Sequence, residues 1–330
     1  MTWRWLVVGC GSIGRRHLRN LRALGQTDLL VYRSRPVGVA EIEREFGARS
    51  FFSLDEALAQ RPEAVLIANP TSLHVPAALR VAEAGHHLFI EKPISHTLDG
   101  TDRLQALVEQ GDLVAMVGYN LRFHPALHAL QGMVGRGEIG DVLSVRAWAG
   151  QYLPDWHPGE DYRQSYVARA DLGGGVVLTL SHELDTLRWL FGEVAEVTAV
   201  VAQPSTLEMS TESLAEITLT FQSGVVAQVH LDCLQRTPSR GCEVIGSAGT
   251  IRCDLIRSEI QVLRAGAEPM VLPILLDDPN QTYLDELAHF MDCIRRGQSP
   301  AVTLADGIAV LKVALAAHRA AETGVRQRCL

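Results

Sequence analysis

The sequence has almost no lysine, and several other features are missing altogether. Of its 30 lysine and arginine residues only Lys92 and Lys312 are lysines, so a lysine in a candidate site stands out. No apolar run reaches membrane-spanning length, and no basic tract accompanies the formal net charge of -8, so we expect neither a membrane nor nucleic acid as a partner. The six cysteines form no CxxC pair and no Cys/His metal spacing. We therefore expect reduced thiols, a cytoplasmic location and no metal site.

Patterns of well-known catalytic centres are also missing, because we find no nucleophile elbow, no P-loop and no metal motif. At 330 residues the chain is long enough for two domains and a sizeable core. Its composition, 47% hydrophobic and 21% charged residues, is ordinary for a soluble globular protein.

What the sequence does contain is a glycine-rich turn near its start. A short apolar run, Trp5–Val8, leads into Gly9-x-Gly11-x-x-Gly14, and an amphipathic stretch follows. We interpret the run as a first strand, not as a leader peptide. The order strand, glycine turn, helix predicts a dinucleotide-binding site, with a βα turn that binds no ligand as the alternative. The residues expected at the pyrophosphate are Gly9, Gly11, Ser12, Ile13 and Gly14.

The end of the second predicted strand bears on the choice of cofactor. An NAD-specific site usually has Asp or Glu there, to accept hydrogen bonds from the ribose hydroxyls. This chain has Arg33, Ser34 and Arg35 instead. Two guanidiniums and a hydroxyl suit a 2′-phosphate, so NADP is the expected cofactor. NAD stays open, because these arginines can also stack on the adenine or lie in solvent.

Helix-like segments and apolar strands alternate through residues 1–120, which predicts a parallel, doubly wound sheet. The expected strands after the first are Asp28–Tyr32, Ala64–Ile67, His87–Ile90 and Leu113–Val117. The expected helices are Val39–Phe46, Leu54–Gln60, Pro70–Ala84 and Thr97–Gln110. Ligands of such sheets bind beyond the carboxyl ends of the strands. Four loops should therefore face the cofactor: Gly9–Gly14, Arg33–Arg35, Asn69–His74 and Glu91–Pro93.

From residue 121 to 330 the pattern changes to consecutive strands with tight turns, which predicts a second domain with an open, mostly antiparallel sheet. Its expected strands are Val142–Trp148, Val194–Val201, Leu214–Phe221, Val225–Leu231, Cys242–Ile245, Thr250–Cys253 and Ile260–Leu263, with helices near Thr282–Arg296 and Leu304–Glu322. Since helices can cover one face of such a sheet and a second subunit the other, we expect a homo-oligomer.

Two polar clusters are candidates for the chemistry. In Glu91-Lys92-Pro93 an ammonium follows an apolar strand, where it can polarise a carbonyl or hydroxyl or relay its proton. A surface Lys–Glu pair at a strand end is the alternative. The other cluster follows Gly173-Gly174-Gly175, where Ser181 is an expected N-cap and His182 and Asp185 share a helix face. A core or capping histidine is the alternative there.

Two further stretches have the composition of ligand-binding loops. The segment from Trp156 to Tyr166 includes Tyr162 and Arg163 and has little apolar periodicity. Rings against sugar faces and polar groups on hydroxyls would suit a polyhydroxylated ligand, although a folded-down surface loop explains the composition equally well. The similar stretch Gly118–Pro125 lies at the predicted junction of the two domains.

Together these motifs resemble the Gfo/Idh/MocA family, the glucose-fructose oxidoreductase and inositol dehydrogenase group, over nearly the whole chain. The matching segments are the glycine turn, Asn69-Pro70-x-x-x-His74, Glu91-Lys92-Pro93, Gly118-Tyr119-Asn120-x-Arg122, Gly173-Gly174-Gly175 through His182-x-x-Asp185, Gly246-x-x-Gly249 and Pro300-x-Val302-Thr303-x-x-Asp306-Gly307. The glycine turn alone is unspecific, but the order of glycine turn, Glu-Lys-Pro and glycine triplet with a later histidine is specific. The Trp156–Arg163 stretch looks most like members found with surface-polysaccharide and nucleotide-sugar enzymes.

The resemblance implies an N-terminal Rossmann domain, a C-terminal α+β domain that packs against a partner subunit in a dimer or tetramer, and NAD(P)-dependent hydride transfer at a hydroxyl or keto carbon of a sugar or nucleotide-sugar-like substrate. It implies Lys92 and His182 as the catalytic pair. Further expected cofactor contacts are Asn69, Pro70, His74, Glu91, Lys92 and Asn120. Expected substrate contacts are Lys92, Tyr119, Arg122, Trp156, Tyr162, Arg163, His182 and Asp185.

One position departs from the family pattern. Many relatives have an Asp three or four residues before the histidine, where this chain has Thr179 and Leu178. The missing carboxylate leaves a non-catalytic NAD(P)-binding sensor or regulatory protein of the same fold as the alternative function.

Overall fold

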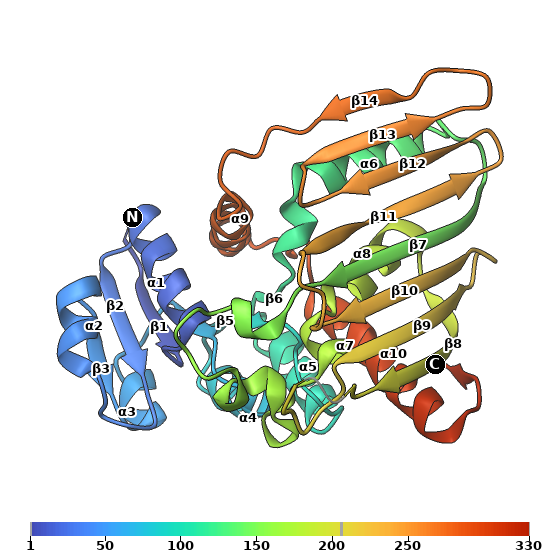
Figure 1. The fold of residues 1–330 in the computed structure, drawn as a ribbon. Coiled ribbons are helices and arrows are strands. Elements are labelled where there is room, and N and C mark those ends of the chain that lie inside the picture. The colour runs from blue at the N-terminus through green and yellow to red at the C-terminus, as the bar shows by residue number, and fades with distance from the viewer. Residues whose placement is uncertain (1, 205–206, 330) are drawn as a thin grey trace. The chain divides into compact units, whose positions relative to one another are not determined.

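The computed structural model describes residues 2–204 and 207–329, and Figure 1 shows them from the blue N-terminus to the red C-terminus. Close contacts divide the chain into two compact units. The first unit holds residues 1–120 together with residues 280–308, and the second holds residues 121–279 and 309–330. The chain therefore passes from one unit to the other at residues 120, 279 and 308.

The first unit contains a six-stranded parallel sheet with the strand order β3-β2-β1-β4-β5-β6. Its strands are β1 (Arg4–Val8), β2 (Asp28–Tyr32), β3 (Arg49–Phe51), β4 (Ala64–Ile67), β5 (His87–Glu91) and β6 (Ala115–Gly118). The order reverses between β1 and β4, and the carboxyl ends of all six strands lie at one edge. The predicted Rossmann sheet is confirmed, and β3 is an additional short strand.

The helices of the first unit are α1 (Ser12–Ala23), α2 (Val39–Phe46), α3 (Leu54–Leu58), α4 (His74–Glu83), α5 (Thr101–Gln110) and α9 (Gln281–Arg296). The helix predicted from residue 70 begins instead with a 3-10 turn, Thr71–Leu73. Helix α9 returns to this unit late in the chain and packs against α1. The Phe290 ring of α9 lies 6.0 Å from the Trp5 ring and 5.7 Å from the Phe89 ring, so α9 completes the core beside β1 and β5.

The second unit contains a nine-stranded sheet with the order β14-β13-β12-β11-β7-β10-β9-β8-β15. The strands are β7 (Val142–Gly150), β8 (Val194–Ala202), β9 (Leu214–Phe221), β10 (Val226–Asp232), β11 (Ser239–Gly246), β12 (Gly249–Asp254), β13 (Glu259–Leu263), β14 (Met270–Pro273) and β15 (Gln327–Arg328). Only the β7–β10 pair is parallel, so the prediction of a mostly antiparallel sheet is confirmed.

One face of this sheet contacts helices α6 (Pro125–Gly135), α7 (Val176–Thr179) and α8 (His182–Phe191). In Figure 1 the other face points to the viewer, and none of the described helices of this unit covers it. A polar network crosses neighbouring strands on this side, in which Glu243 of β11 pairs with Arg146 of β7 and Arg252 of β12. We call this side the open face.

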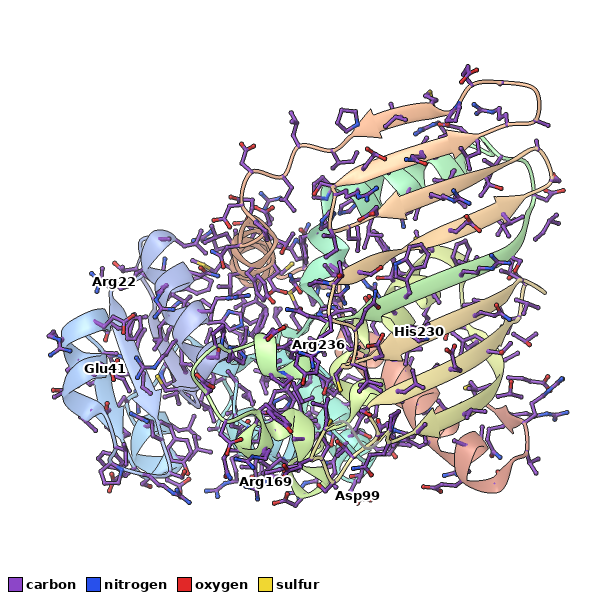
Figure 2. All side chains as sticks on the ribbon, viewed as in Figure 1. Arg22, Glu41, Asp99, Arg169, His230 and Arg236 are labelled. Atoms are coloured by element: carbon purple, nitrogen blue, oxygen red, sulfur yellow. The ribbon has the colours of Figure 1, made fainter. Side chains whose placement is uncertain are left out.

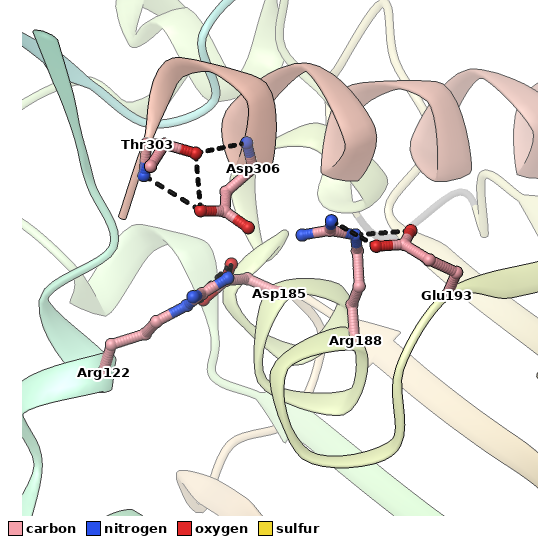
Figure 3. A network of polar contacts seen from close by, with 6 residues as sticks. All are labelled: Arg122, Asp185, Arg188, Glu193, Thr303 and Asp306. Atoms are coloured by element: carbon pink, nitrogen blue, oxygen red, sulfur yellow. Dashed lines mark hydrogen bonds and ion pairs between the residues drawn. The ribbon is translucent and has the colours of Figure 1, made fainter. Parts of the chain in front are cut away.

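The connection between 150 and 173 is irregular and contains four 3-10 turns: Leu153–Asp155, Tyr162–Gln164, Tyr166–Ala168 and Ala170–Leu172. A further 3-10 turn, Asn120–Phe123, follows β6. Helix α10 (Leu304–Thr323) begins with a reciprocal cap, in which the Thr303 and Asp306 side chains each accept the other residue's backbone N–H (Figure 3). In the part of the chain that the structure describes, no helix combines the length and apolar character needed to cross a bilayer.

Candidate active site

The glycine turn after β1 has the geometry that close approach requires. Gly9 has a φ of +95°, and a Cβ there would lie 2.7 Å from the Asn69 backbone nitrogen. A Cβ on Gly14 would lie 2.3 Å from the Gly9 oxygen, so helix α1 meets the turn too closely for a side chain. Beside Gly11, in contrast, no atom lies within 4 Å of a built Cβ, and no side chain caps α1 among the described residues. The free N–H groups of this helix end suit a pyrophosphate.

Arg33 provides a cation where β2 ends. Its backbone N–H donates to the Phe51 oxygen, which fixes the start of the loop. The guanidinium nitrogen Nη1 is buried and has no hydrogen-bond partner among the described residues. The nearby Glu41, labelled in Figure 2, is held by Arg15 through bonds of 2.9 and 3.0 Å. Arg33 can therefore receive an anion, while Ser34 and Arg35 beside it are exposed.

His74 joins two of the loops at the carboxyl edge of the sheet. Its Nδ1 lies 2.9 Å from the Pro93 oxygen and its Nε2 lies 2.8 Å from the Asn69 oxygen. Burial lowers the pKa of this imidazole, although both carbonyl groups act in the opposite direction. The contacts hold the Asn69 loop against the strand end that carries Lys92. His74 is therefore placed to shape this edge and is itself 1% exposed.

Glu91, the last residue of β5, is buried directly behind Lys92. Its Oε1 lies 2.6 Å from Nε2 of His17 on α1, and its Oε2 accepts the Lys92 backbone N–H at 3.1 Å. These contacts fix the backbone of Lys92, whose side chain is half-buried. Glu286 of α9 lies beside the pair, and one ligating atom from each of the three residues lies within 4.8 Å of the others.

In the second unit, His182 is the first residue of α8, and Ser181 occupies the expected N-cap position. Two glycines of the preceding triplet are required by packing. A Cβ on Gly174 would lie 2.2 Å from the Tyr166 oxygen, and one on Gly175, whose φ is +98°, would lie 2.2 Å from the Glu212 carboxylate. Thr179, at the end of α7, is buried.

Asp185 and Arg122, both expected to contact substrate, form a buried ion pair with each other. Arg122 donates from Nε at 2.9 Å and from Nη2 at 2.7 Å to the two carboxylate oxygens, and the side chains are 6% and 1% exposed (Figure 3). The Arg122 guanidinium also lies 5.8 Å from the centre of the Trp189 ring. The pair anchors the first turn of α8, the turn that carries His182.

A second ion pair holds the same helix turn. Arg240 of β11 donates to both oxygens of Glu183, at 2.7 and 3.0 Å. The sequence analysis did not select either residue. With Asp185 and Glu183 both tied to arginines, the backbone position of His182 is fixed from two sides.

Further expected substrate and cofactor residues make contacts within their own unit. Trp156 Nε1 donates to the Gln151 oxygen at 3.0 Å, and the Tyr162 hydroxyl accepts the Glu208 N–H at 3.1 Å. Arg163 is exposed and pairs with Asp161 at 2.8 Å. In the first unit Tyr119 is fully buried, and Asn120 donates to Thr282 at 2.7 Å.

The parallel sheet with its glycine turn defines a dinucleotide-binding fold, and the rest of the chain adds a second mixed-sheet domain. Family comparison agrees with both parts. Residues 3–119 match the oxidoreductase family with an NAD-binding Rossmann fold, and residues 127–252 match the GFO/IDH/MocA C-terminal domain. The chain belongs to the GFO/IDH/MocA family of oxidoreductases, as the resemblance of its motifs implied.

Several relatives match along nearly the whole chain. The scyllo-inositol 2-dehydrogenase (NAD(+)) of Bacillus subtilis is 29% identical over 340 residues, which cover 98% of this chain and 95% of that protein. The 1,5-anhydro-D-fructose reductase of Ensifer adhaerens is 28% identical over 330 residues, which cover 97% of each chain. Among solved structures, levoglucosan dehydrogenase in complex with NADH and levoglucosan superposes with a TM-score of 0.89 at 23% identity and full coverage of both chains. This last similarity supports the fold.

Proposed function

We propose that this protein transfers hydride between a nicotinamide cofactor and a hydroxyl or keto carbon of a sugar or sugar-like substrate. The observation that carries the proposal is the position of Lys92, which follows β5 at the same sheet edge as the glycine turn after β1. The family membership supports it, because the matching N-terminal domain is an NAD-binding one. The named relatives support the substrate class, since they act on inositols and an anhydrosugar.

In this proposal the bound nicotinamide supplies the hydride acceptor or donor, and the protein supplies orientation and proton transfer. The Lys92 ammonium donates a hydrogen bond to the substrate oxygen and polarises its bond to carbon. His182 takes the hydroxyl proton in the oxidative direction and returns it in the reductive direction. The contacts of Glu91, Asp185 and Glu183 fix the backbone from which the two side chains extend.

The test measures cofactor binding and turnover together. Lys92→Ala and His182→Ala should each lower kcat by about a hundredfold or more while cofactor affinity is retained. Lys312→Ala is the matched control, because it removes the other lysine and should keep turnover. Unchanged turnover in both active-site variants would refute the proposed chemistry.

We propose NADP as the preferred cofactor, with Arg33 contacting the 2′-phosphate and Arg35 adding a second positive charge. The buried guanidinium nitrogen of Arg33 supports this choice. NAD is the alternative cofactor, because the structure of the related levoglucosan dehydrogenase contains NADH. Fluorescence titration of NADPH and NADH should show that Arg33→Ala weakens NADPH binding by about tenfold or more and changes NADH binding little. Equal affinities in the unmodified protein would contradict the preference for NADP, and tighter binding of NADH would favour NAD.

A non-catalytic NAD(P)-binding sensor is the second candidate, because Thr179 stands where many relatives have an Asp. A broad panel of inositols, monosaccharides, anhydrosugars and nucleotide sugars distinguishes the two, with reduced-cofactor absorbance as the readout. Turnover of any member supports the enzyme, and the active class decides whether the Trp156–Arg163 stretch binds a nucleotide-linked sugar. Tight cofactor binding without turnover supports the sensor. Nucleotide that co-purifies would indicate an enzyme that recycles a tightly held cofactor.

We further propose that a dimer or tetramer forms through the open face. Residues 1–120 would bind the dinucleotide, and residues 121–330 would bind the substrate and the partner subunit. The proposed location is the cytoplasm. Light scattering on the unmodified protein and on Val200→Glu, a substitution at a position 67% exposed on β8, tests the interface. The variant should lower the mass to that of a smaller species, and an unchanged mass would place any interface elsewhere. Cell fractionation tests the location.

A further inference from the structure

The carboxylate behind Lys92 has a second carboxyl group as its neighbour. Glu91 is 6% exposed and Glu286 is fully buried, and their nearest ligating atoms lie within 4.8 Å together with one nitrogen of His17. Two negative charges this close, both away from water, would repel strongly. The two groups therefore need different protonation states at neutral pH.

The hydrogen bonds show which of the two is ionised. Glu91 receives a hydrogen bond on each oxygen, from Nε2–H of His17 and from the Lys92 backbone N–H. Glu286 has no hydrogen-bond partner on either oxygen among the described residues. A buried carboxylate without donors is costly, whereas a neutral carboxyl is tolerated. Burial and the charge of Glu91 accordingly raise the pKa of Glu286 well above its ordinary value.

Among the described residues, no other charged group forms a hydrogen bond with Glu286. From α1, His17 is bonded to Glu91, and the exposed Arg16 lies over the Tyr283 ring at 4.7 Å. Lys92 and His74 act electrostatically on Glu91, which in turn acts on Glu286. The His17 ring also packs against two aromatic rings, that of Phe89 at 5.4 Å and that of Tyr283 at 6.1 Å.

A shared proton explains this cluster better than a metal ion. The His17–Glu91 separation of 2.6 Å is that of a strong hydrogen bond. Two atoms bound to one zinc ion at about 2.0 to 2.1 Å in tetrahedral geometry stand more than 3 Å apart. The pair would have to separate before both of its atoms could bind one ion.

We propose that Lys92 adjoins an asymmetric carboxyl pair in which Glu286 keeps its proton at neutral pH and Glu91 carries the negative charge. Glu286 is thus a positioning residue: its proton keeps the second negative charge away, so that one carboxylate sets both the backbone and the ionisation of Lys92. The inference deepens the proposed function and rests on the role proposed there for Lys92. The protonation states can be measured without turnover.

The first test uses unfolding. In the unfolded chain Glu286 loses its proton near the ordinary glutamate pKa of 4.5, whereas the folded protein keeps that proton. The free energy of unfolding therefore falls as pH rises above 4.5. Glu286→Gln, a permanently neutral isostere, should therefore become more stable than the unmodified protein as pH rises from 5 to 8, by up to about tenfold in the unfolding equilibrium per pH unit. Asp285→Asn, on the same helix, should show no such trend. Destabilisation by Glu286→Gln at every pH would overturn the proposal and favour an ionised or metal-bound carboxylate.

The second test compares the two isosteric amides at Lys92. With only two lysines in the chain, isotope-labelled lysine gives two side-chain signals, which Lys312→Arg assigns. Glu91→Gln should lower the midpoint of Lys92 titration by about one to three pH units, since it removes a neighbouring negative charge. Glu286→Gln should leave that midpoint unchanged and remove the infrared carbonyl band of a buried protonated carboxyl. A lowered midpoint in Glu286→Gln, or no band to lose, would contradict the asymmetry. If both results hold but Lys92→Ala keeps its turnover, the proposed function fails and the carboxyl pair stands.

Discussion

Asp185 and Glu286 are both buried carboxyl groups, and they differ in how the protein treats their charge. Asp185 is 1% exposed and receives hydrogen bonds on both carboxylate oxygens from one guanidinium, so its charge is matched by an opposite charge in fixed geometry. Glu286 is equally buried, but the charge that acts on it is that of another carboxylate, Glu91. The Arg122–Asp185 pair stabilises the first turn of α8 only while Asp185 is ionised. The Glu91–Glu286 pair is tolerated only because Glu286 is neutral.

The largest effect should come from breaking the satisfied pair. Asp185→Asn keeps the shape of the side chain but leaves the Arg122 guanidinium buried beside a neutral amide. We expect a loss of about 3 to 5 kcal/mol in the free energy of unfolding, measured by urea denaturation. The double variant Arg122→Met, Asp185→Leu should recover much of this loss, since it removes both charges. A loss no larger than that of a surface substitution would show that the pair is not the anchor of α8. The same amide change at Glu286 is expected to act in the opposite direction at alkaline pH.

A smaller, pH-dependent effect is expected for His230 on the open face, labelled in Figure 2. Its ring lies 2.5 Å from Glu216 and 3.0 Å from Asp232. Burial lowers the pKa of His230, but the two carboxylates outweigh it and raise the pKa above 6.5. The charged imidazole therefore stabilises the folded protein fully below pH 6.5, and this stabilisation is lost as pH rises through the folded-state pKa of His230. His230→Gln should be destabilised at pH 5.5 and nearly equal to the unmodified protein at pH 9. A constant difference across this range would argue against a charged imidazole.

The smallest effect should come from an exposed pair. Arg136 donates to Glu138 at 2.7 Å, and the arginine side chain is 65% exposed. Water and side-chain entropy cancel most of the gain in such pairs, so Arg136→Ala should change the free energy of unfolding by about 1 kcal/mol or less. Urea denaturation alongside Asp185→Asn gives the comparison directly. A loss as large as that of Asp185→Asn would mean that burial is not what separates the two pairs.

Much of the fold could be predicted because its signals are local. The glycine turn, the alternating helices and strands, and the tight turns of the second sheet each occupy a short stretch. Strands β3, β14 and β15 were missed, since two to four residues are too few to show alternation. Helix α6 was missed as well, although Pro125 at its first position is a common start signal.

The candidate site was less accessible to sequence reasoning, because its contacts join residues far apart in the chain. Lys92 and His182 were selected from their immediate surroundings. Arg122, Asp185 and Glu91 were selected too, but as contacts of substrate or cofactor, and their pairing was not predicted. Arg122 and its partner Asp185 are 63 positions apart, and Glu91 and its partner His17 are 74 apart. One signal was readable, since Glu286 lies four residues after Thr282 and four before Phe290, on the buried stripe of α9. A carboxyl group on such a stripe needs a partner or a proton.

The late return of residues 280–308 to the first unit makes the two units interleaved rather than consecutive. A fragment that stops at residue 120 would retain the whole parallel sheet but lose Phe290 from beside Trp5 and Phe89. It would also lose Glu286, and with it the neighbour of Glu91. An autonomous version of this unit therefore has to join residue 120 to residue 280 by a linker. Such a splice would isolate the cofactor half of the molecule, complete with its buried carboxyl pair, for study without the other half.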